Sequence, residues 1–255
     1  MSLVYNLDFI NDKSKKSNIK KAISILERAY YSHLETSSFF LDPYEQDVIE
    51  SIARKNNLDI LFIGGNNLSE RKIFVANYYY EPLDEANYLK ILKFKSDSIN
   101  HPDVLGALIN LGIDRNSIGD ISVLDGEIEF AVLAEDANFI KYNLSKIKRE
   151  GIKVEIKEEC KIKLKEPDYV QGRGFVSSLR LDNIVSEILN MSRAKAKNLI
   201  NSKFVKVNFQ TITDPSLNIE EESLISIRKQ GRFIFDEVSG MSKKGNYHIE
   251  YRKIV

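Results

Sequence analysis

The chain has 255 residues, of which 43% are hydrophobic and 29% charged, and its 37 Lys and Arg balance its 37 Asp and Glu. This composition is that of an ordinary soluble protein, long enough for one large domain or two to three small ones. No run approaches the length of a membrane span, and no signal peptide is recognisable at the start, so we expect neither a membrane partner nor export. Cys160 is the single cysteine, which excludes an intrachain disulfide and favours a cytoplasmic location.

The balanced charge hides an asymmetry along the chain. Residues 1–171 carry 23 Lys and Arg against 28 Asp and Glu, whereas residues 172–255 carry 14 against 9. Such a division suggests a basic module for a polyanion joined to a more acidic body, although drift among surface charges gives the same numbers.

Residues 1–84 predict an N-terminal α/β unit in the order helix, helix, strand, strand. The first helix follows an apolar stripe from Ile19 to Ala29. The second has strong start signals: Asp42 as N-cap, Pro43 at the first helical position and Glu45 three residues after the cap. Residues 59–65 and 71–80 are the predicted strands.

Residues 85–160 predict a ferredoxin-like (RRM-like) domain with the order β-α-β-β-α-β. A hairpin turn is expected at Asp125-Gly126, and a second helix is expected over residues 135–150 with Phe139 buried. Phe130 is the only aromatic residue in the central strand, where Glu127 and Glu129 flank it and would repel phosphates. We therefore expect this domain to contact protein, or RNA through another face.

Residues 161–173 predict a linker, and residues 174–255 a basic domain of two short helices followed by strands. The second helix has Ser192 as N-cap and then Arg193, Lys195 and Lys197, where the helix dipole disfavours cations. Two explanations are open: the cost is tolerated, or an anion outside the chain offsets it. Asp182 is expected to cap the first helix.

Four motifs of this domain resemble the S-four (alpha-L) RNA-binding domain. They are RLD from Arg180, SRAKAKNLI from Ser192, VKVN from Val205 and ISIRKQGRF from Ile225. The family pattern has glycine where this chain has Lys203 and Glu222. Further motifs, FLDPYEQ from Phe40, FIGG from Phe62, SERK from Ser69 and HPDVLGALINLGIDRNSIGDI from His101, are similar to the YlmH family of bacterial S-four-domain proteins.

The resemblance implies a non-catalytic RNA-binding protein in the quality control of stalled translation, with ribosomal RNA, tRNA and the large ribosomal subunit as partners. It also implies a link to cell-division genes. The implied contacts lie on the two-helix face, here defined as Arg180, Ser192, Arg193, Lys195 and Lys197. Lys203 and Lys206 are neighbours, and cations of the later strands are further candidates: Arg228, Arg232, Lys243 and Lys244. The interpretation fails if these cations are scattered or are paired with carboxylates of the chain.

Two other functions stay open. The acidic first 171 residues would suit a protein-interaction adaptor for the division machinery. An RNA-modifying enzyme would need catalytic residues in the same part, where no glycine-rich nucleotide-binding loop occurs. His33, His101 and His248 lack a second ligand at metal-binding spacing. We expect no catalytic residues, no metal and no cofactor.

Overall fold

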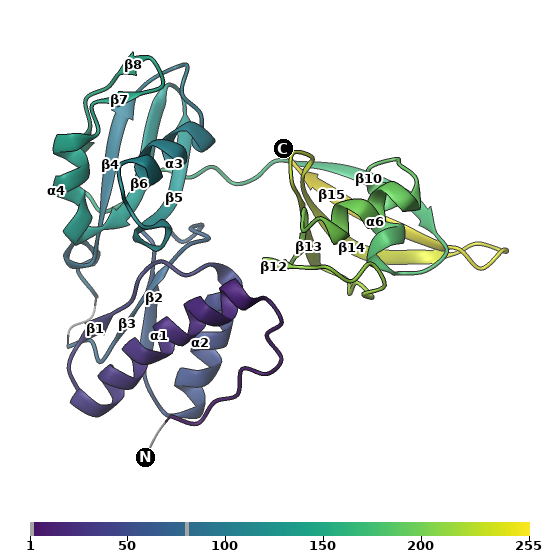
Figure 1. Ribbon diagram of the computed structural model, residues 1–255, viewed down its shortest axis with the longest axis horizontal. Helices are drawn as coiled ribbons and strands as arrows, with labels where there is room; N and C mark the ends of the chain where they lie inside the picture. The colour runs from purple at the N-terminus through teal and green to yellow at the C-terminus, as the bar shows by residue number, and fades with distance from the viewer. Residues whose placement is uncertain (1–2, 80–81) are drawn as a thin grey trace. The chain divides into compact units, whose positions relative to one another are not determined.

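The computed structural model describes residues 3–79 and 82–255 of the chain and shows a mixture of helices and strands (Figure 1). Two compact units are present, Met1–Lys165 and Glu166–Val255. The predicted α+β fold class is confirmed, and each unit is considered by itself.

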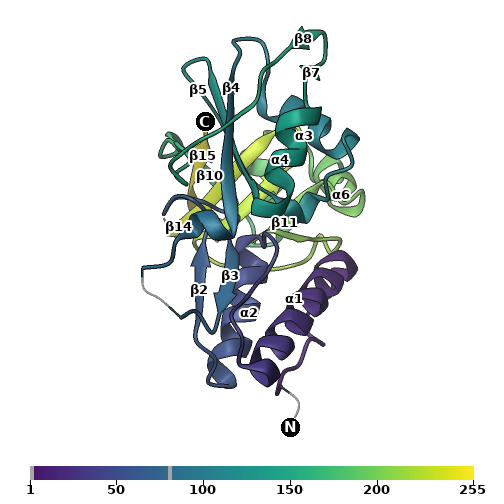
Figure 2. The same ribbon diagram turned by 90° about the vertical axis from the view of Figure 1, so that its left-hand side faces the viewer.

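The first part of unit 1 is a three-stranded antiparallel sheet with two helices on one face (Figure 2). Its elements are α1 (Lys13–Ser32), β1 (Thr36–Ser37), α2 (Pro43–Lys55), β2 (Ile60–Ile63) and β3 (Ile73–Ala76), in the sheet order β1-β3-β2. The start of α2 is the predicted capping box: the Asp42 carboxylate accepts from the Glu45 N–H, and the Glu45 carboxylate accepts from the Asp42 N–H. The second predicted strand is shorter than expected, because Asn77 has a left-handed backbone with φ 53°. Tyr80, the last residue of that predicted strand, lies outside the described residues.

The second part of unit 1 has the predicted β-α-β-β-α-β order. Its elements are β4 (Leu89–Lys95), α3 (His101–Asn110), β5 (Ile118–Leu124), β6 (Glu127–Leu133), α4 (Ala134–Asn143) and β9 (Glu155–Ile156), with short 3-10 turns at Glu85–Asn87 and Arg115–Ser117. The sheet order β5-β6-β4-β9 is that of a ferredoxin-like fold. Asp125 and Gly126 both have positive φ, as a primed hairpin turn requires.

The predicted helix over residues 135–150 is wrong in its second half. Helix α4 ends at Asn143, and a small hairpin of β7 (Lys146–Ile147) and β8 (Glu150–Gly151) follows. Phe139, expected to be buried, is 49% exposed. Lys148 turns the hairpin with φ 55°. Leu144, just after α4, and Ile147 of β7 still reach the core, although neither lies in a helix.

The two parts of unit 1 share a core. Strand β3 is buried on both faces: Phe74 packs toward α1 and α2, whereas Ile73 and Val75 pack against Leu89 and Ile91 of β4. Such a fully apolar strand fits between two layers.

A polar contact fixes the same junction. The Arg71 guanidinium donates to the carbonyl oxygens of Phe40 and Ile118 at 2.8 and 2.9 Å, and Asp120 accepts from the backbone N–H of Arg71 at 3.2 Å. Arg115 also donates to the Ile118 carbonyl, at 2.6 Å. Several of the family-like motifs therefore meet at this junction.

The segment after β9, residues 157–165, is called the strap here because it crosses from the ferredoxin-like sheet to the first sheet. Its Ile162 is 1% exposed, and the Ile162 N–H donates to the Gly65 carbonyl at 3.1 Å. The predicted linker over residues 161–173 is wrong at both ends. The contacts place residues 161–165 in unit 1, and residues 169–173 belong to strand β10 (Tyr169–Val176) of unit 2.

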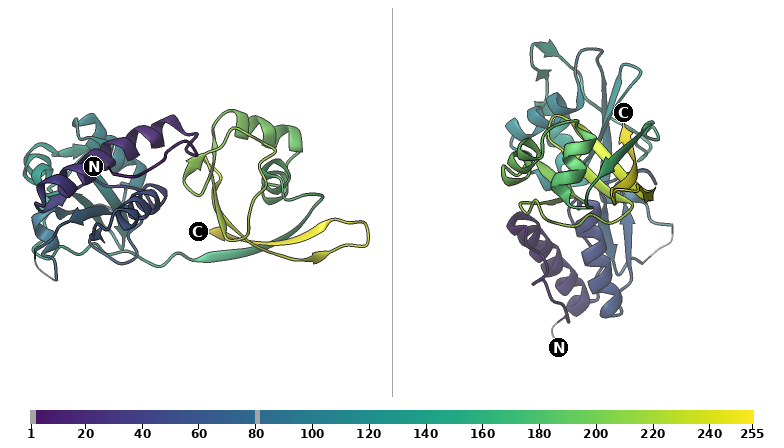
Figure 3. Two further views of the ribbon diagram at one scale, coloured as in Figure 1. Left: turned by 90° about the horizontal axis from the view of Figure 1, so that it is seen from below. Right: turned by 90° about the vertical axis from the view of Figure 1, so that its right-hand side faces the viewer.

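Unit 2 is one antiparallel sheet with both helices on one face (Figure 3, left). The elements are β10 (Tyr169–Val176), α5 (Leu181–Ile188), α6 (Arg193–Asn201), β11 (Val205–Val207), β12 (Gln210–Thr211), β13 (Ser223–Ile227), β14 (Gly231–Met241) and β15 (Tyr247–Ile254). The sheet order is β10-β15-β14-β13-β11-β12. Lys203 and Glu222, where the resembled family has glycine, both adopt a left-handed backbone, with φ 63° and 62°.

Candidate RNA-binding surface

Helices α5 and α6 bury their apolar sides in the core of unit 2 and turn their cations outward. Ile184 and Ile200 are fully buried. The Ser192 hydroxyl accepts from the Lys195 N–H at 3.4 Å, which confirms Ser192 as the N-cap of α6. The spacing of the apolar residues leaves Arg193 and Lys197 on the outer side, where both side chains are 47% exposed.

One buried carboxylate holds three of the predicted cations. Asp182 of α5 has a side-chain exposure of 0%, and its oxygens lie 2.9 Å from Nη2 of Arg193, 3.2 Å from Nε of Arg180 and 3.7 Å from Nζ of Lys197. Arg180 approaches it with two donors, Nε and Nη2. A single negative charge therefore positions three positive ones.

The prediction that Asp182 caps its helix is wrong. The N-cap position of α5 is Arg180, and no side chain caps this helix. The N–H groups of Leu181 and Asp182 instead donate to the carbonyl oxygens of Leu217 and Pro215. Because this loop satisfies the first donors of α5, the carboxylate is left to contact the neighbouring helix.

This contact changes the explanation for cations at the start of α6. Neither tolerance nor an outside anion is needed to offset their cost, since Asp182 supplies a negative charge from within the chain. The condition set for failure is thus met in part, because Arg180, Arg193 and Lys197 do have an internal carboxylate partner. That partner carries one charge against their three, so the cluster keeps a net charge of +2.

The pKa of Asp182 depends on the balance between its burial and its cationic partners. Burial raises the pKa of its carboxyl, but the hydrogen bonds and charges of Arg180 and Arg193 outweigh burial and leave the pKa below its ordinary value. The pKa of Arg180 is raised in return by its hydrogen bonds to Asp182. The carboxylate therefore stays charged, and its three partners stay oriented, throughout the neutral range.

The cluster retains donors for an external anion. Arg193 gives Asp182 one hydrogen bond, and within the described parts of the chain its other N–H groups have no acceptor. Lys197 lies beyond hydrogen-bond distance of the carboxylate, and the neighbouring Lys195 is exposed with no carboxylate within ion-pair distance in the described chain. Exposed, pre-oriented guanidinium and ammonium groups of this kind suit phosphate oxygens.

The remaining predicted cations lie on other parts of unit 2. Lys206 of β11 and Arg232 of β14 share one row of the sheet, both facing Ser226 of β13, on the side away from the helices. Arg228 follows β13 and stacks on Phe204. Lys243 and Lys244 are exposed in the turn of the long β14–β15 hairpin, which projects beyond the helices (Figure 3, left). The structure therefore groups only Arg180, Arg193 and Lys197 closely.

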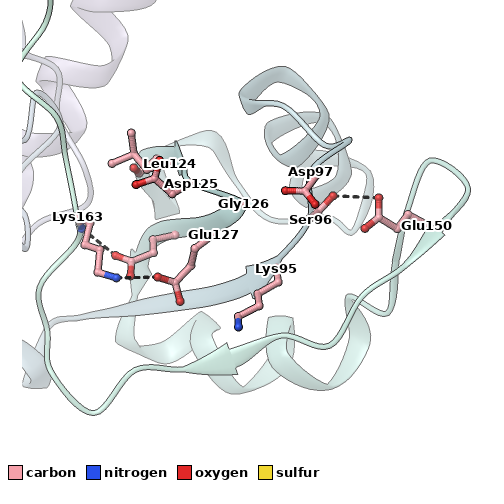
Figure 4. A pocket seen from close by; sticks show the side chains of 11 residues that line it. Lys95, Ser96, Asp97, Leu124, Asp125, Gly126, Glu127, Glu150 and Lys163 are labelled. Atoms are coloured by element: carbon pink, nitrogen blue, oxygen red, sulfur yellow. Dashed lines mark hydrogen bonds and ion pairs between the residues drawn. The ribbon is translucent and has the colours of Figure 1, made fainter.

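The open sheet face of the ferredoxin-like domain carries paired charges and is partly closed. Glu127 pairs with Lys93 and Lys163, and Glu129 pairs with Lys157. The pocket on this face, of about 750 Å³, is lined mainly by polar residues, among them Asp97, Asp125 and Glu127 (Figure 4). Lys163 of the strap binds Glu127 with 2.8 Å between Nζ and Oε2, which lowers the pKa of that carboxyl. Beside it, Glu129 is 2% exposed and accepts from the Lys163 N–H at 2.8 Å. The strap and these ion pairs therefore occupy part of the open sheet face.

Other reactive groups do not form a site. Across residues 3–79 and 82–255, no group of three or more His, Cys, Asp and Glu could hold a metal ion. Burial, with the charge of Glu85, raises the pKa of the Cys160 thiol to about 12, and its sulfur contacts the Leu89 carbonyl. No helix in the described chain has the length and apolar character of a membrane span.

Comparison with known proteins identifies two domains in the chain. Residues 86–161 match the family described as "Putative RNA-binding domain in YlmH", and residues 179–225 match the S4 domain, which is the S-four domain. The chain is 28% identical over 220 residues to "Ribosome-associated protein quality control protein P2" of Bacillus subtilis (strain 168), covering 84% of this chain and 85% of that protein. Over these two domains and much of its length, the chain is similar to YlmH-type proteins.

A solved YlmH structure has the same fold over part of the chain. "Cell division protein ylmH from Streptococcus pneumoniae" superposes with a TM-score of 0.51 at 19% identity, covering 60% of this chain and 95% of that one. The YlmH domain match spans β4 to β9, and the S4 match contains α5, α6 and Lys206. Arg228, Arg232 and the hairpin lysines lie outside the S4 match.

Sequence reasoning missed two residues of unit 2, a buried counter-ion and an exposed aromatic residue. Asp182 was assigned to a cap, although its position in the first turn of an apolar helix gave no sign of a shared counter-ion. Phe204 drew no comment because it alternates with buried Val205 as an ordinary strand residue would. Its place directly after Lys203 was the available signal.

Proposed function

We propose that this protein is a non-catalytic RNA-binding protein that acts at the ribosome, gripping rRNA of the large subunit or tRNA with the two-helix face. The observation that carries the proposal is the sharing of one buried carboxylate by Arg180, Arg193 and Lys197, which gives this four-residue cluster a net charge of +2. Neutralised phosphates and the shape of the RNA, rather than base edges, would then select the site.

The relatives support the same assignment. The Bacillus subtilis protein is named for ribosome-associated quality control, and we extend to this chain a role in the quality control of stalled translation in the cytoplasm. The Streptococcus pneumoniae protein is named a cell division protein, and a link to division stays a prediction for this chain. Against an enzyme, Asp182 of the RLD motif is fully buried behind three cations and so is closed to a substrate.

The decisive experiment neutralises the outer charges of α6 without opposing Asp182. Glutamate at position 193 or 197 would face the buried carboxylate and disturb the fold, so the double variant Arg193→Gln/Lys197→Gln is the sharper choice. It is expected to lose co-sedimentation with large ribosomal subunits and to lower the log-log salt slope of RNA binding by about 2.

The matched control is Lys146→Gln/Lys153→Gln, which removes the same charge from exposed positions of unit 1. It is expected to bind as the wild type does. Full co-sedimentation of the Arg193/Lys197 variant, with its fold intact by circular dichroism, would move the site elsewhere and favour the adaptor hypothesis. Altered nucleosides in RNA incubated with the wild-type protein would favour an enzyme.

A further inference from the structure

A phenylalanine stands exposed at the end of α6, held there by its backbone. The Phe204 N–H donates to the Leu199 carbonyl at 3.0 Å, and the Phe204 carbonyl accepts from the Arg228 N–H at 2.9 Å. The residue is nevertheless 37% exposed, while the next residue, Val205, is fully buried. The backbone thus presents the ring at the surface in a defined position.

Cations surround this ring. The Arg228 guanidinium carbon lies 5.2 Å from the centroid of the Phe204 ring, within cation–π range. Lys203 precedes the ring and Lys229 follows the arginine, both with a left-handed backbone that favours glycine, at φ 63° and 66°. Two lysines are thus kept in a conformation that costs them energy, on either side of an arginine–aromatic pair.

These cations lack a carboxylate partner in the part of the chain that the structure describes. Across the described chain, no carboxylate lies within ion-pair distance of Lys203, Arg228 or Lys229. A second arginine–aromatic pair of the same unit shows the contrast: Arg252 lies over Tyr169 at 5.0 Å but is also bound to Asp236 at 2.6 Å. Arg252 thus has both an aromatic and a carboxylate partner, whereas Arg228 has only the aromatic one among the described residues.

An exposed ring among uncompensated cations has the chemistry that binds an unstacked nucleotide, with the base on the ring or guanidinium and the phosphate on the ammonium groups. A base inside an A-form stem offers no free face, so a duplex does not satisfy the site. We propose that Phe204 and Arg228 form a stacking site for one unpaired base of the RNA that the two-helix face holds. This inference rests on the proposed function, and it assigns to the ligand a loop or bulge beside the gripped phosphates.

The position relative to the two-helix face fits this assignment. Arg193 and Asn201 are the two ends of α6, which are about 12 Å apart at 1.5 Å per residue, and Phe204 follows the second end. One RNA hairpin can therefore place backbone phosphates at the first end of α6 and a loop base at the other.

The chain contains no tryptophan, which allows a direct test. In the variant Phe204→Trp, the single indole reports on its own surroundings, and a stacked base quenches its fluorescence. The probe is a synthetic RNA hairpin with a loop of adenosines, compared with the same hairpin carrying abasic loop residues. The matched control is Phe175→Trp, at an exposed position of β10 in the same unit. We expect quenching only for Phe204→Trp and only with the adenosine loop.

A second measurement uses Phe204→Leu, which keeps the apolar side chain and removes the ring face. Its affinity for the adenosine-loop hairpin is expected to fall about tenfold, with an unchanged salt slope, because a stacking contact and not a phosphate contact is lost. Equal affinity of wild type and Phe204→Leu, or equal quenching with abasic and adenosine loops, would overturn the stacking site.

The outcomes separate the two proposals. If Arg193→Gln/Lys197→Gln loses the hairpin and Phe204→Leu does not, the two-helix face stands and the stacking site falls. If both variants bind as the wild type does, both the proposed function and the stacking site are wrong. Binding of an acidic peptide that Phe204→Leu abolishes, with no response to the hairpin, would assign the ring to a protein partner and overturn the inference.

Discussion

At the scale of single residues, Asp182 governs the candidate surface although it cannot touch the ligand. Its buried carboxylate contacts Arg180, Arg193 and Lys197 and so holds these three side chains in one oriented cluster. Sequence spacing predicted which cations share the outer side of α6, because helical periodicity determines that. It could not predict the counter-ion, because Asp182 and Arg193 are 11 residues apart on different helices and meet only through the packing of α5 on α6.

Asp182→Asn is expected to destabilise α5 and α6 by about 2 kcal/mol at neutral pH. Removing one partner of a buried ion pair typically costs about 3–5 kcal/mol, and the partial exposure of the three cations reduces that figure. Because the pKa of Asp182 is lowered in the folded state, its contribution is present above its unfolded pKa and is lost as the pH falls through the folded value. Hydrogen exchange of the α5 and α6 amides measures both effects.

The acid dependence provides the check on cause. The difference between wild type and Asp182→Asn is expected to shrink as the pH falls below the ordinary carboxyl pKa, since the wild type then loses the same charge. A difference that stays constant down to acid pH would show that packing around the side chain, and not its charge, accounts for the loss.

At the scale of elements, local signals predicted starts better than ends. The caps at Asp42 and Ser192 were predicted from two or three neighbouring residues and are confirmed, because a cap is a local hydrogen bond. The end of α4 was not predicted, since Leu144 and Ile147 keep helical spacing while the chain turns at Lys148. Strands β11 and β13 alternate in burial, whereas β15, also predicted to alternate, does not. The order of the strands depends on long-range pairing that alternation does not encode.

The capping box of α2 allows the cap to be separated from its charge. Asp42 also pairs with Lys15 of α1. Asp42→Ala is expected to cost about 1–2 kcal/mol, because the Glu45 N–H loses its acceptor and Lys15 loses one of its ion-pair partners. Asp42→Asn retains the cap and loses only the charge, and we expect a cost below about 1 kcal/mol. Urea unfolding followed by circular dichroism measures both, and equal losses would assign the effect to the ion pair.

At the scale of the whole molecule, the family-like motifs divide by role. Those of the S4 domain provide the charged face, whereas Phe40, Arg71 and Asp120 join the two parts of unit 1. From one sequence, both sets stand out equally as motifs. Arg71 could not be assigned to a junction in advance, because its acceptors lie 31 and 47 residues away in the chain. Burial of Arg71 identifies it as a structural residue. Its pKa is lowered below the ordinary value by that burial, and its guanidinium donates to backbone carbonyls.

Arg71→Ala is therefore expected to weaken unit 1 and to leave RNA binding unchanged. The substitution removes the donors to the Phe40 and Ile118 carbonyls, and buried acceptors without partners cost about 1–3 kcal/mol each. Because Arg115 still serves the Ile118 carbonyl, we expect a loss of about 2–4 kcal/mol in urea unfolding. Arg71→Lys keeps the charge but lacks the planar guanidinium, so its stability should lie between those of the wild type and Arg71→Ala.

Lys72→Ala is the neighbouring control, since no carboxylate in the described chain pairs with Lys72, and its cost is expected to stay within about 0.5 kcal/mol. Hydrogen exchange then separates the units: in Arg71→Ala, protection should fall across β3 and β5, while α5 and α6 retain theirs, because the core residues of unit 2 form a cluster of their own. Affinity for the adenosine-loop hairpin should equal that of the wild type. A loss of RNA affinity in Arg71→Ala with α5 and α6 still protected would place part of the RNA contact on unit 1, in addition to the two-helix face of unit 2.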